Sequence, residues 1–169
     1  MQYDKLTYSD IDKISHLQPE GWPEITHAFQ FYCNHDFCNP VKMTIDNEIV
    51  GIGNSILFDK TAWLAHIIVN SDHRNRGIGY KIVDSLIEDI KTRGIETSLL
   101  IATELGEPVY IKAGFHKISD YRYFKRESPH SEKNSLIIFN HIKMIFIMTL
   151  FSLILIFQAR IEKGFLKIT

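Results

Sequence analysis

Two glycines flanked by basic side chains form the clearest candidate for chemistry in this sequence. Gly77 and Gly79 are separated by one residue and follow an apolar run. Arg74, Arg76 and Lys81 lie beside them. Glycine lets a backbone bend with positive φ and brings its N–H groups close to a ligand, and a helix beginning here would add unpaired N–H groups and partial positive charge. This combination suits a pyrophosphate; the alternative is a polar surface turn.

The spacing of the glycines excludes the two commonest phosphate-binding motifs. A Walker loop ends in Gly-Lys-Ser/Thr, which is absent here. The dinucleotide fingerprint needs a third glycine three residues after Gly79, where this chain has Ile82.

The order Arg-x-x-Gly-x-Gly, five residues after a strand-terminal valine, resembles the acetyl-CoA loop of the GNAT family of N-acetyltransferases. The residues that carry it are Val69, Arg74, Gly77 and Gly79. A second resemblance lies at 110–115, where Tyr-Ile-Lys-Ala-Gly-Phe is similar to the Tyr-x-x-x-Gly-Phe signature that closes the same site in the family. The resemblance covers residues 1–127.

This resemblance implies a mixed central sheet whose middle strands splay apart to admit the thioester of acetyl-CoA. Main-chain groups of 67–69 would meet the pantetheine arm, N–H groups of 75–79 the pyrophosphate, and Arg74 would set the loop and its charge. Thr103 stands where many members carry an asparagine, which puts that one contact in doubt. The cofactor-binding residues expected on this basis are Ile67, Ile68, Val69, Arg74, Asn75, Arg76, Gly77, Ile78, Gly79, Tyr80 and Thr103.

The implied reaction is attack by a neutral amine on the thioester. It needs a proton acceptor for the amine, stabilisation of the oxyanion and a proton for the thiolate. A backbone N–H near Ile68 or Val69 could serve the oxyanion. Tyr110 matches the position where the family often uses a tyrosine as general acid, and a phenol with a pKa near ~10 stays protonated at neutral pH. The alternative for Tyr110 is a packing residue.

Three residues are candidates for the general base. His66 lies three residues before Val69 and has an intrinsic pKa of ~6.5, suited to proton acceptance. It could equally be a core histidine. Glu104 and Glu107 are alternatives beside a strand end, although Glu104 could be solvated and Glu107 could only favour a helix start.

Periodicity predicts an α/β (α+β) fold with helices around one mixed sheet, and the resemblance implies that this is a GNAT-like mixed central sheet flanked by helices. Strands are expected at 2–7, 41–45, 49–58, 62–69, 97–102 and 117–124, the last of the sheet. Helices are expected at 10–17 with Ser9 as N-cap, 23–32, 79–92 and 107–113. Strict alternation along 62–69 places Trp63, Ala65, Ile67 and Val69 on one face, and Leu64, His66 and Ile68 on the other.

Composition excludes several classes of protein. The chain has 169 residues, 45% of them hydrophobic, and a formal net charge of -1, as in an ordinary globular domain without a general affinity for nucleic acid. Two cysteines and a polar N-terminus predict a cytoplasmic protein without a secretory signal. Cys33, His35 and Cys38 lack a second ligand cluster, so no metal site is expected. Nearby aromatics such as Phe29 and Tyr32 suit a core or an acceptor-pocket wall.

The composition changes near residue 127. Residues 1–127 hold 14 basic and 18 acidic side chains, whereas 128–169 hold 5 and 2. We therefore expect an acetyl-CoA-binding domain at 1–127, a linker at 128–135 and an apolar tail at 136–169. The 22 residues of 136–157 could span a membrane as a C-terminal anchor, pack on the domain or on another copy in an oligomer, or have no selected role.

The function predicted is N-acetyl transfer from acetyl-CoA to a primary amine on a small molecule, amino acid or peptide, with direct attack in a ternary complex. The alternative is a non-catalytic acyl-CoA-binding or interaction module, attached to a membrane or not. Such a module would keep the glycine loop without needing Tyr110 or His66.

Overall fold

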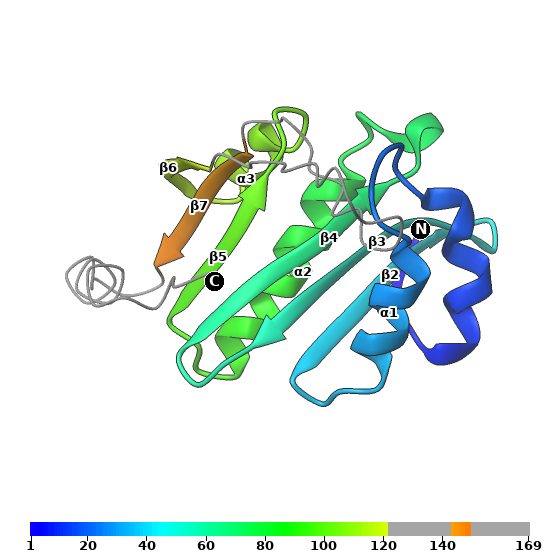
Figure 1. The fold of residues 1–169 in the computed structure, drawn as a ribbon, viewed down its shortest axis with the longest axis horizontal. Helices are drawn as coiled ribbons and strands as arrows, with labels where there is room; N and C mark the ends of the chain where they lie inside the picture. Colours follow the sequence, from blue (N-terminus) through cyan, green and yellow to red (C-terminus); the bar gives the residue numbers. More distant parts are fainter. Residues whose placement is uncertain (122–142, 150–169) are drawn as a thin grey trace, which may run out of the picture.

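One seven-stranded mixed sheet organises the chain, in a computed structural model that describes residues 1–121 and 143–149 (Figure 1). The strand order is β1-β2-β3-β4-β5-β7-β6. The elements are β1 (Gln2–Lys5), the 3₁₀ helix η1 (Tyr8–Leu17), α1 (Ile25–Cys33), β2 (Cys38–Ile45), β3 (Glu48–Leu57), β4 (Thr61–Val69), the 3₁₀ turn η2 (Ser71–His73), α2 (Ile78–Thr92), β5 (Thr97–Ala102), α3 (Glu107–Lys112), β6 (His116–Tyr121) and β7 (Lys143–Thr149).

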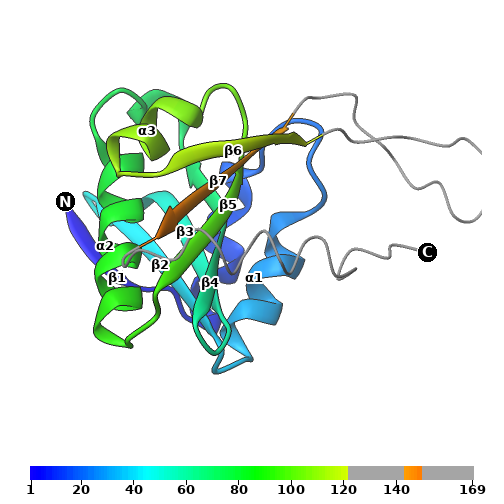
Figure 2. The same ribbon diagram turned by 90° about the vertical axis from the view of Figure 1, so that its left-hand side faces the viewer.

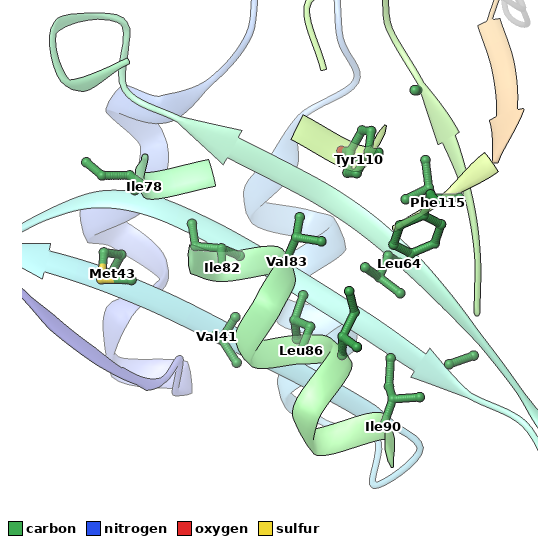
Figure 3. Close-up of a cluster of buried hydrophobic side chains, with 14 of the residues drawn as sticks. Val41, Met43, Leu64, Ile78, Ile82, Val83, Leu86, Ile90, Tyr110 and Phe115 are labelled. Carbon is green, nitrogen blue, oxygen red and sulfur yellow. The ribbon is translucent and has the colours of Figure 1, made fainter. Parts of the chain in front are cut away.

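Helices cover both faces of this sheet, as the expected fold class requires. α2 and α3 lie on one face, and η1 and α1 on the other (Figure 2). The α2-side core is the larger cluster of buried side chains (Figure 3), and includes Val41, Met43, Val50, Leu64, Ile78, Ile82, Val83, Leu86, Ile87, Ile90, Leu100, Tyr110 and Phe115. The α1-side core includes Leu6, Ile11, Ile14, Leu17, Ile25, Phe29, Tyr32, Cys38, Ile49, Ile52 and Ile68.

Helix α2 packs closely on β3 because two glycines leave room for it. A Cβ atom at Gly53 would lie 2.6 Å from Cγ2 of Ile82, and one at Gly51 would lie 2.9 Å from Cδ1 of the same residue. Real Cβ atoms are not found at such distances, so β3 needs glycine at both positions to hold the helix that carries the glycine loop.

The first helical segment differs from the expectation in its start and its type. It begins at Tyr8 as a 3₁₀ helix, and its N-cap is Thr7 rather than Ser9. The main-chain N–H and the hydroxyl of Thr7 donate to Oδ2 of Asp10 at 3.0 and 2.9 Å. Lys42 lies 2.6 Å from the same oxygen. Burial would raise the pKa of Asp10, but these hydrogen bonds outweigh it and the pKa is lowered.

The strand predicted at 117–124 is an edge strand of the sheet, but it is not the last strand along the chain. The segment expected at 117–124 forms β6, His116–Tyr121, and β7 then enters between β5 and β6, antiparallel to both. All six residues of β5 pair with β7, from Thr97 opposite Thr149 to Ala102 opposite Met144. Residues 143–149 of the apolar tail therefore pair within the sheet.

The rest of that tail and the linker at 128–135 lie outside the described residues, and the boundary at 127 stays a prediction. Across residues 1–121 and 143–149, the helices are all too short or too polar to cross a bilayer.

Candidate active site

The sheet opens at its centre, between β4 and β5. These neighbours are parallel and pair at Thr61 with Thr97, Ala62 with Ser98 and Trp63 with Leu99. Both strands continue, to Val69 and Ala102, but in the described part of the chain their ladder ends at Trp63. The two strands diverge visibly from that point (Figure 1). The carboxyl-terminal half of β4 therefore keeps main-chain groups for another partner.

A β-bulge at His66 determines which main-chain groups of β4 face the opening. His66 has φ 51°, and the register with β3 shifts between Ile52 and Asn54, so that Gly53 faces both His66 and Ile67. A bulge adds one residue to a strand and thereby reverses the direction of the groups that follow.

The hydrogen bonds at the end of β4 fix the direction of its remaining N–H groups. Asn70 N–H donates to the Val50 carbonyl at 2.9 Å, so Ile68, two residues earlier and paired with Ile52, also faces β3. Ile67 and Val69 consequently direct their N–H groups toward the opening. Ile67 and Val69, and not Ile68, therefore present main-chain N–H groups to the opening.

The predicted phosphate loop joins the end of β4 to α2. Nε of Arg74 donates to the Val69 carbonyl at 3.2 Å, and the side chain of Asn70 accepts from Asp72 N–H at 2.9 Å. Asn75 and Gly77 have positive φ, 59° and 77°. These bonds and turns fold the exposed loop residues Arg74, Asn75, Arg76 and Gly77 back over the strand end.

The N-terminus of α2 completes this loop. Gly77 is the N-cap, and the first intrahelical bond runs from Lys81 N–H to the Gly77 carbonyl at 3.0 Å. The N–H groups of Ile78, Gly79 and Tyr80 precede that bond, as at every helix start. Ile78 contributes only its main chain, because its side chain is buried in the α2-side core.

Gly79 and Tyr80 connect the loop to α3. A Cβ at Gly79 would make ordinary contacts with Val69 and Val109, at 3.6 and 3.9 Å. The ammonium of Lys112 lies 4.9 Å from the ring centroid of Tyr80. The end of β4, the loop and α3 thus meet at one place, as the two sequence motifs require.

Tyr110 lies in the α2-side core, 8% exposed, with its ring centroid 6.1 Å from that of Phe115 (Figure 3). Burial raises the pKa of its hydroxyl above the usual range, which keeps the phenol protonated. Thr103 stabilises the start of α3, the helix that carries Tyr110. Its side-chain Oγ1 accepts from Gly106 N–H at 3.3 Å, and its main-chain carbonyl accepts from the N–H groups of Gly106 and Glu107.

His66 lies on the opposite face of the sheet from Tyr110. Its Nδ1 is 2.8 Å from the hydroxyl of Tyr32 on α1. Burial, with a smaller contribution from the Cys38 thiol, raises the pKa of Tyr32 to about 12. Local sequence pattern does not predict a hydrogen bond between Tyr32 and His66, because 33 residues separate them in the chain.

The carboxylates proposed as alternative bases lie elsewhere. Glu104 is exposed in the turn after β5, and Glu107 is half-buried as the first residue of α3, where an acid favours the helix start.

Cys33 is half-buried and Cys38 is buried. Burial raises the pKa of both the Cys33 and the Cys38 thiol, which opposes the thiolate form that metals bind. Both are free cysteines. Within residues 1–121 and 143–149, His, Cys, Asp and Glu side chains do not gather in any group of three that could hold a metal ion.

A sequence model described as the acetyltransferase (GNAT) family matches residues 8–115, which include both motifs. The chain therefore belongs to the GNAT family of acetyltransferases, which makes it an acyltransferase. Among curated proteins, none matches it in sequence.

Solved structures agree on the fold. The ribosomal-protein-S18-alanine N-acetyltransferase from Escherichia coli superposes with a TM-score of 0.73 at 15% identity, covering 90% of this chain and 95% of that one. An aminoglycoside 6'-N-acetyltransferase complexed with coenzyme A gives 0.69 at 16% identity, covering 90% and 99%. An IAA acetyltransferase from Bacillus cereus gives 0.64 at 17%, covering 88% and 98%.

Proposed function

We propose that this protein is an acetyl-CoA-dependent N-acetyltransferase that acetylates a primary amine by direct attack in a ternary complex. One observation carries the proposal: the opening between β4 and β5 begins where the ladder ends at Trp63 and leads to the glycine loop at the start of α2. A long, thin molecule with an anionic end fits this arrangement.

The loop suits the pyrophosphate of coenzyme A. The N–H groups of the first turn of α2 and the helix dipole favour an anion. Arg74 and Arg76 are exposed beside them and add two full positive charges. A similarly folded acetyltransferase has been solved with coenzyme A bound, which supports the same ligand here.

The opening between β4 and β5 suits the pantetheine arm and the thioester of acetyl-CoA. Amide groups of the pantetheine arm can pair with the N–H groups that Ile67 and Val69 direct into the gap, as a missing strand would. The same N–H groups are donors for the thioester oxygen, whose negative charge increases during attack.

Acetyl-CoA, when bound, supplies the activated acetyl group; the protein supplies proton transfer from two sides of the sheet. Tyr110, protonated by burial, is the proton donor for the thiolate on the face of α2. His66, on the face of α1, is the proton acceptor for the amine, and Glu104 through water is the alternative. With donor and acceptor on opposite faces, the amine loses its proton to His66 on one side of the bound thioester, and the departing thiolate receives a proton from Tyr110 on the other.

The test is the release of free thiol from acetyl-CoA across a panel of primary amines, amino acids and peptides, together with calorimetric titration of acetyl-CoA. We expect micromolar to millimolar binding and amine-dependent thiol release. Binding without thiol release for any amine would favour the alternative function, a non-catalytic acyl-CoA-binding module. Absence of both would contradict the site itself.

A further inference from the structure

The imidazole of His66 is enclosed by three aromatic rings of the α1 side. The ring centroids of Trp22, Phe29 and Tyr32 lie 6.0, 6.0 and 5.6 Å from that of His66, with interplanar angles of 71°, 74° and 61°. These four residues are called the aromatic site below. Rings at such distances and angles make edge-to-face contacts, so they fix the position of the imidazole in addition to the Tyr32 hydrogen bond.

The exposure of the rings shows from where a ligand can approach. Phe29 is fully buried and Tyr32 is 7% exposed, whereas Trp22 is 36% exposed. Phe29 and Tyr32 therefore belong to the α1-side core, and a ligand reaches the aromatic site at Trp22, in the turn that precedes this helix.

That turn is held by the side chain of Gln18. Its Nε2 lies within hydrogen-bonding distance of the carbonyls of Pro19, Trp22 and Pro23, at 3.2, 3.0 and 3.2 Å. Its Oε1 accepts from Ile25 N–H at 2.9 Å. Because one side chain bridges both ends of the turn, Trp22 is presented in a fixed place, which lowers the entropy lost on binding a ligand.

The aromatic site lies where an acyl group would emerge from the opening. His66 forms the bulge of β4, and the next residue, Ile67, directs its N–H into the gap. The glycine loop continues into α2 on one face, whereas Tyr32 and Phe29 belong to the core on the other face. A molecule bound at the loop and threaded through the gap ends beside His66.

The charge near this site is opposite to that of the loop. Residues 14–41 contain no Lys or Arg but three acidic residues, Glu20, Glu24 and Asp36. Glu20 and Glu24 stand two positions on either side of Trp22. The loop, in contrast, carries Arg74, Arg76 and Lys81. A cationic amine is therefore repelled from the pyrophosphate region and attracted to Trp22, since the face of an aromatic ring also favours cations.

We propose that the aromatic site binds the acceptor of this acetyltransferase, and that it selects a single primary amine carried on a flat apolar group, such as an arylalkylamine. This inference rests on the proposed function for the role of the bound amine. The exposed part of the Trp22 ring favours a flat apolar body beside His66, and one exposed carboxylate, Glu20, matches one ammonium group. Glu24 already accepts from Thr26 N–H and its hydroxyl, at 3.4 and 3.0 Å. A polyamine would need several carboxylates at this point.

The experiment measures binding of 2-phenylethylamine, ethylamine and spermidine to the full chain saturated with coenzyme A. We expect 2-phenylethylamine to bind at least about tenfold more tightly than either of the others, because only its ring can pack against Trp22. Trp22→Ala should weaken that binding about tenfold and leave the affinity for coenzyme A within twofold. Trp22→Phe should restore most of it.

The matched control is Phe58→Ala, which removes another exposed aromatic ring, 59% exposed, between β3 and β4. It should change none of the three affinities. Equal binding of ethylamine, tighter binding of spermidine, or an unchanged affinity in Trp22→Ala would each overturn the aromatic site. Thiol release separates the two proposals: its absence with every amine, despite Trp22-dependent binding of 2-phenylethylamine, contradicts the proposed reaction and leaves the binding site standing.

Discussion

The guanidinium Nε of Arg74 donates a hydrogen bond to the main-chain carbonyl of Val69, 3.2 Å away. Val69 is the last residue of β4, and its carbonyl, like its N–H, is directed away from β3. The bond therefore ties the glycine loop to the strand that borders the opening. The same side chain sets the loop and places a positive charge on it.

Replacing Arg74 should weaken acetyl-CoA binding. Arg74→Ala removes the bond to Val69 and one positive charge, and a charge-assisted hydrogen bond contributes about 1.5–3 kcal/mol, so we expect an affinity at least about tenfold lower. Titration calorimetry measures it. Arg93→Ala is the control, because Arg93 is an exposed arginine at the other end of α2, paired with Asp89 at 2.8 Å. An equal loss of acetyl-CoA affinity in both variants would mean that the affinity depends on the net charge of the protein and not on the position of Arg74.

The conformation of Gly77 gives a second test of the loop. Gly77 and Gly94 flank the two ends of α2 with φ 77° and 70°, and a Cβ at either would meet no atom within 4 Å. Alanine at each should therefore destabilise the fold by a similar ~1–2 kcal/mol. Only Gly77→Ala should also lower the affinity for acetyl-CoA, since Gly77 lies at the anion-binding end. Matching thermal shifts with different cofactor affinities are the expected result; unchanged affinity in Gly77→Ala would contradict the pyrophosphate assignment.

Removal of the Tyr110 hydroxyl should slow turnover without weakening cofactor binding. Tyr110→Phe keeps the packing in the α2-side core but removes the proton donor, and general acid catalysis contributes about a hundredfold or more to rate. We expect kcat to fall about that much while the affinity for acetyl-CoA changes less than twofold. Tyr8→Phe, at a tyrosine that is 59% exposed, is the control. A variant Tyr110→Phe with normal kcat would leave this residue a packing role only.

Much of the fold and of the cofactor loop follows from sequence because each depends on local pattern. The helix around Ile82, Leu86 and Ile90 is readable from apolar spacing, since burial of one face requires it. The loop is readable from Gly77 and Gly79, because few other residues tolerate the required backbone.

The bulge at His66 could not be predicted from local sequence pattern. Strict alternation predicted Leu64 and Ile68 on one face of β4, with Ile67 on the other, and this was wrong. Leu64 and Ile67 pack in the α2-side core, whereas Ile68 packs with α1. Histidine is among the non-glycine residues that are enriched at positive φ, but such a conformation is uncommon for any of them, so His66 alone did not mark the extra residue. The position of β7 was hidden for a different reason: an apolar run is equally compatible with a buried strand and with an apolar helix.

Alkaline pH should destabilise the protein from about pH 10 upward. Burial raises the pKa of Tyr32 to about 12 and that of Tyr110 further, compared with 10.0 in the unfolded chain. Above pH 10 the unfolded state therefore loses protons that the folded state keeps, and the free energy of unfolding falls as pH rises, by up to about 1.4 kcal/mol per pH unit for each tyrosine. Urea unfolding between pH 8 and 11 measures the slope. Tyr32→Phe should make it shallower, whereas Tyr8→Phe should not.

The pairing of β7 predicts that a proline within it will disturb the sheet. Ile147 lies opposite Leu99 of β5 and His116 of β6, so the strand has a neighbour on each side. Ile147→Pro removes a main-chain N–H from this ladder, and we expect a loss of about 1–3 kcal/mol in the free energy of unfolding. Gln2→Pro is the control, because Gln2 is the first residue of the edge strand β1 and a proline is tolerated there. Urea unfolding of both variants compares the two positions, and an unaffected Ile147→Pro would show that β5 and β6 do not depend on β7 for their stability.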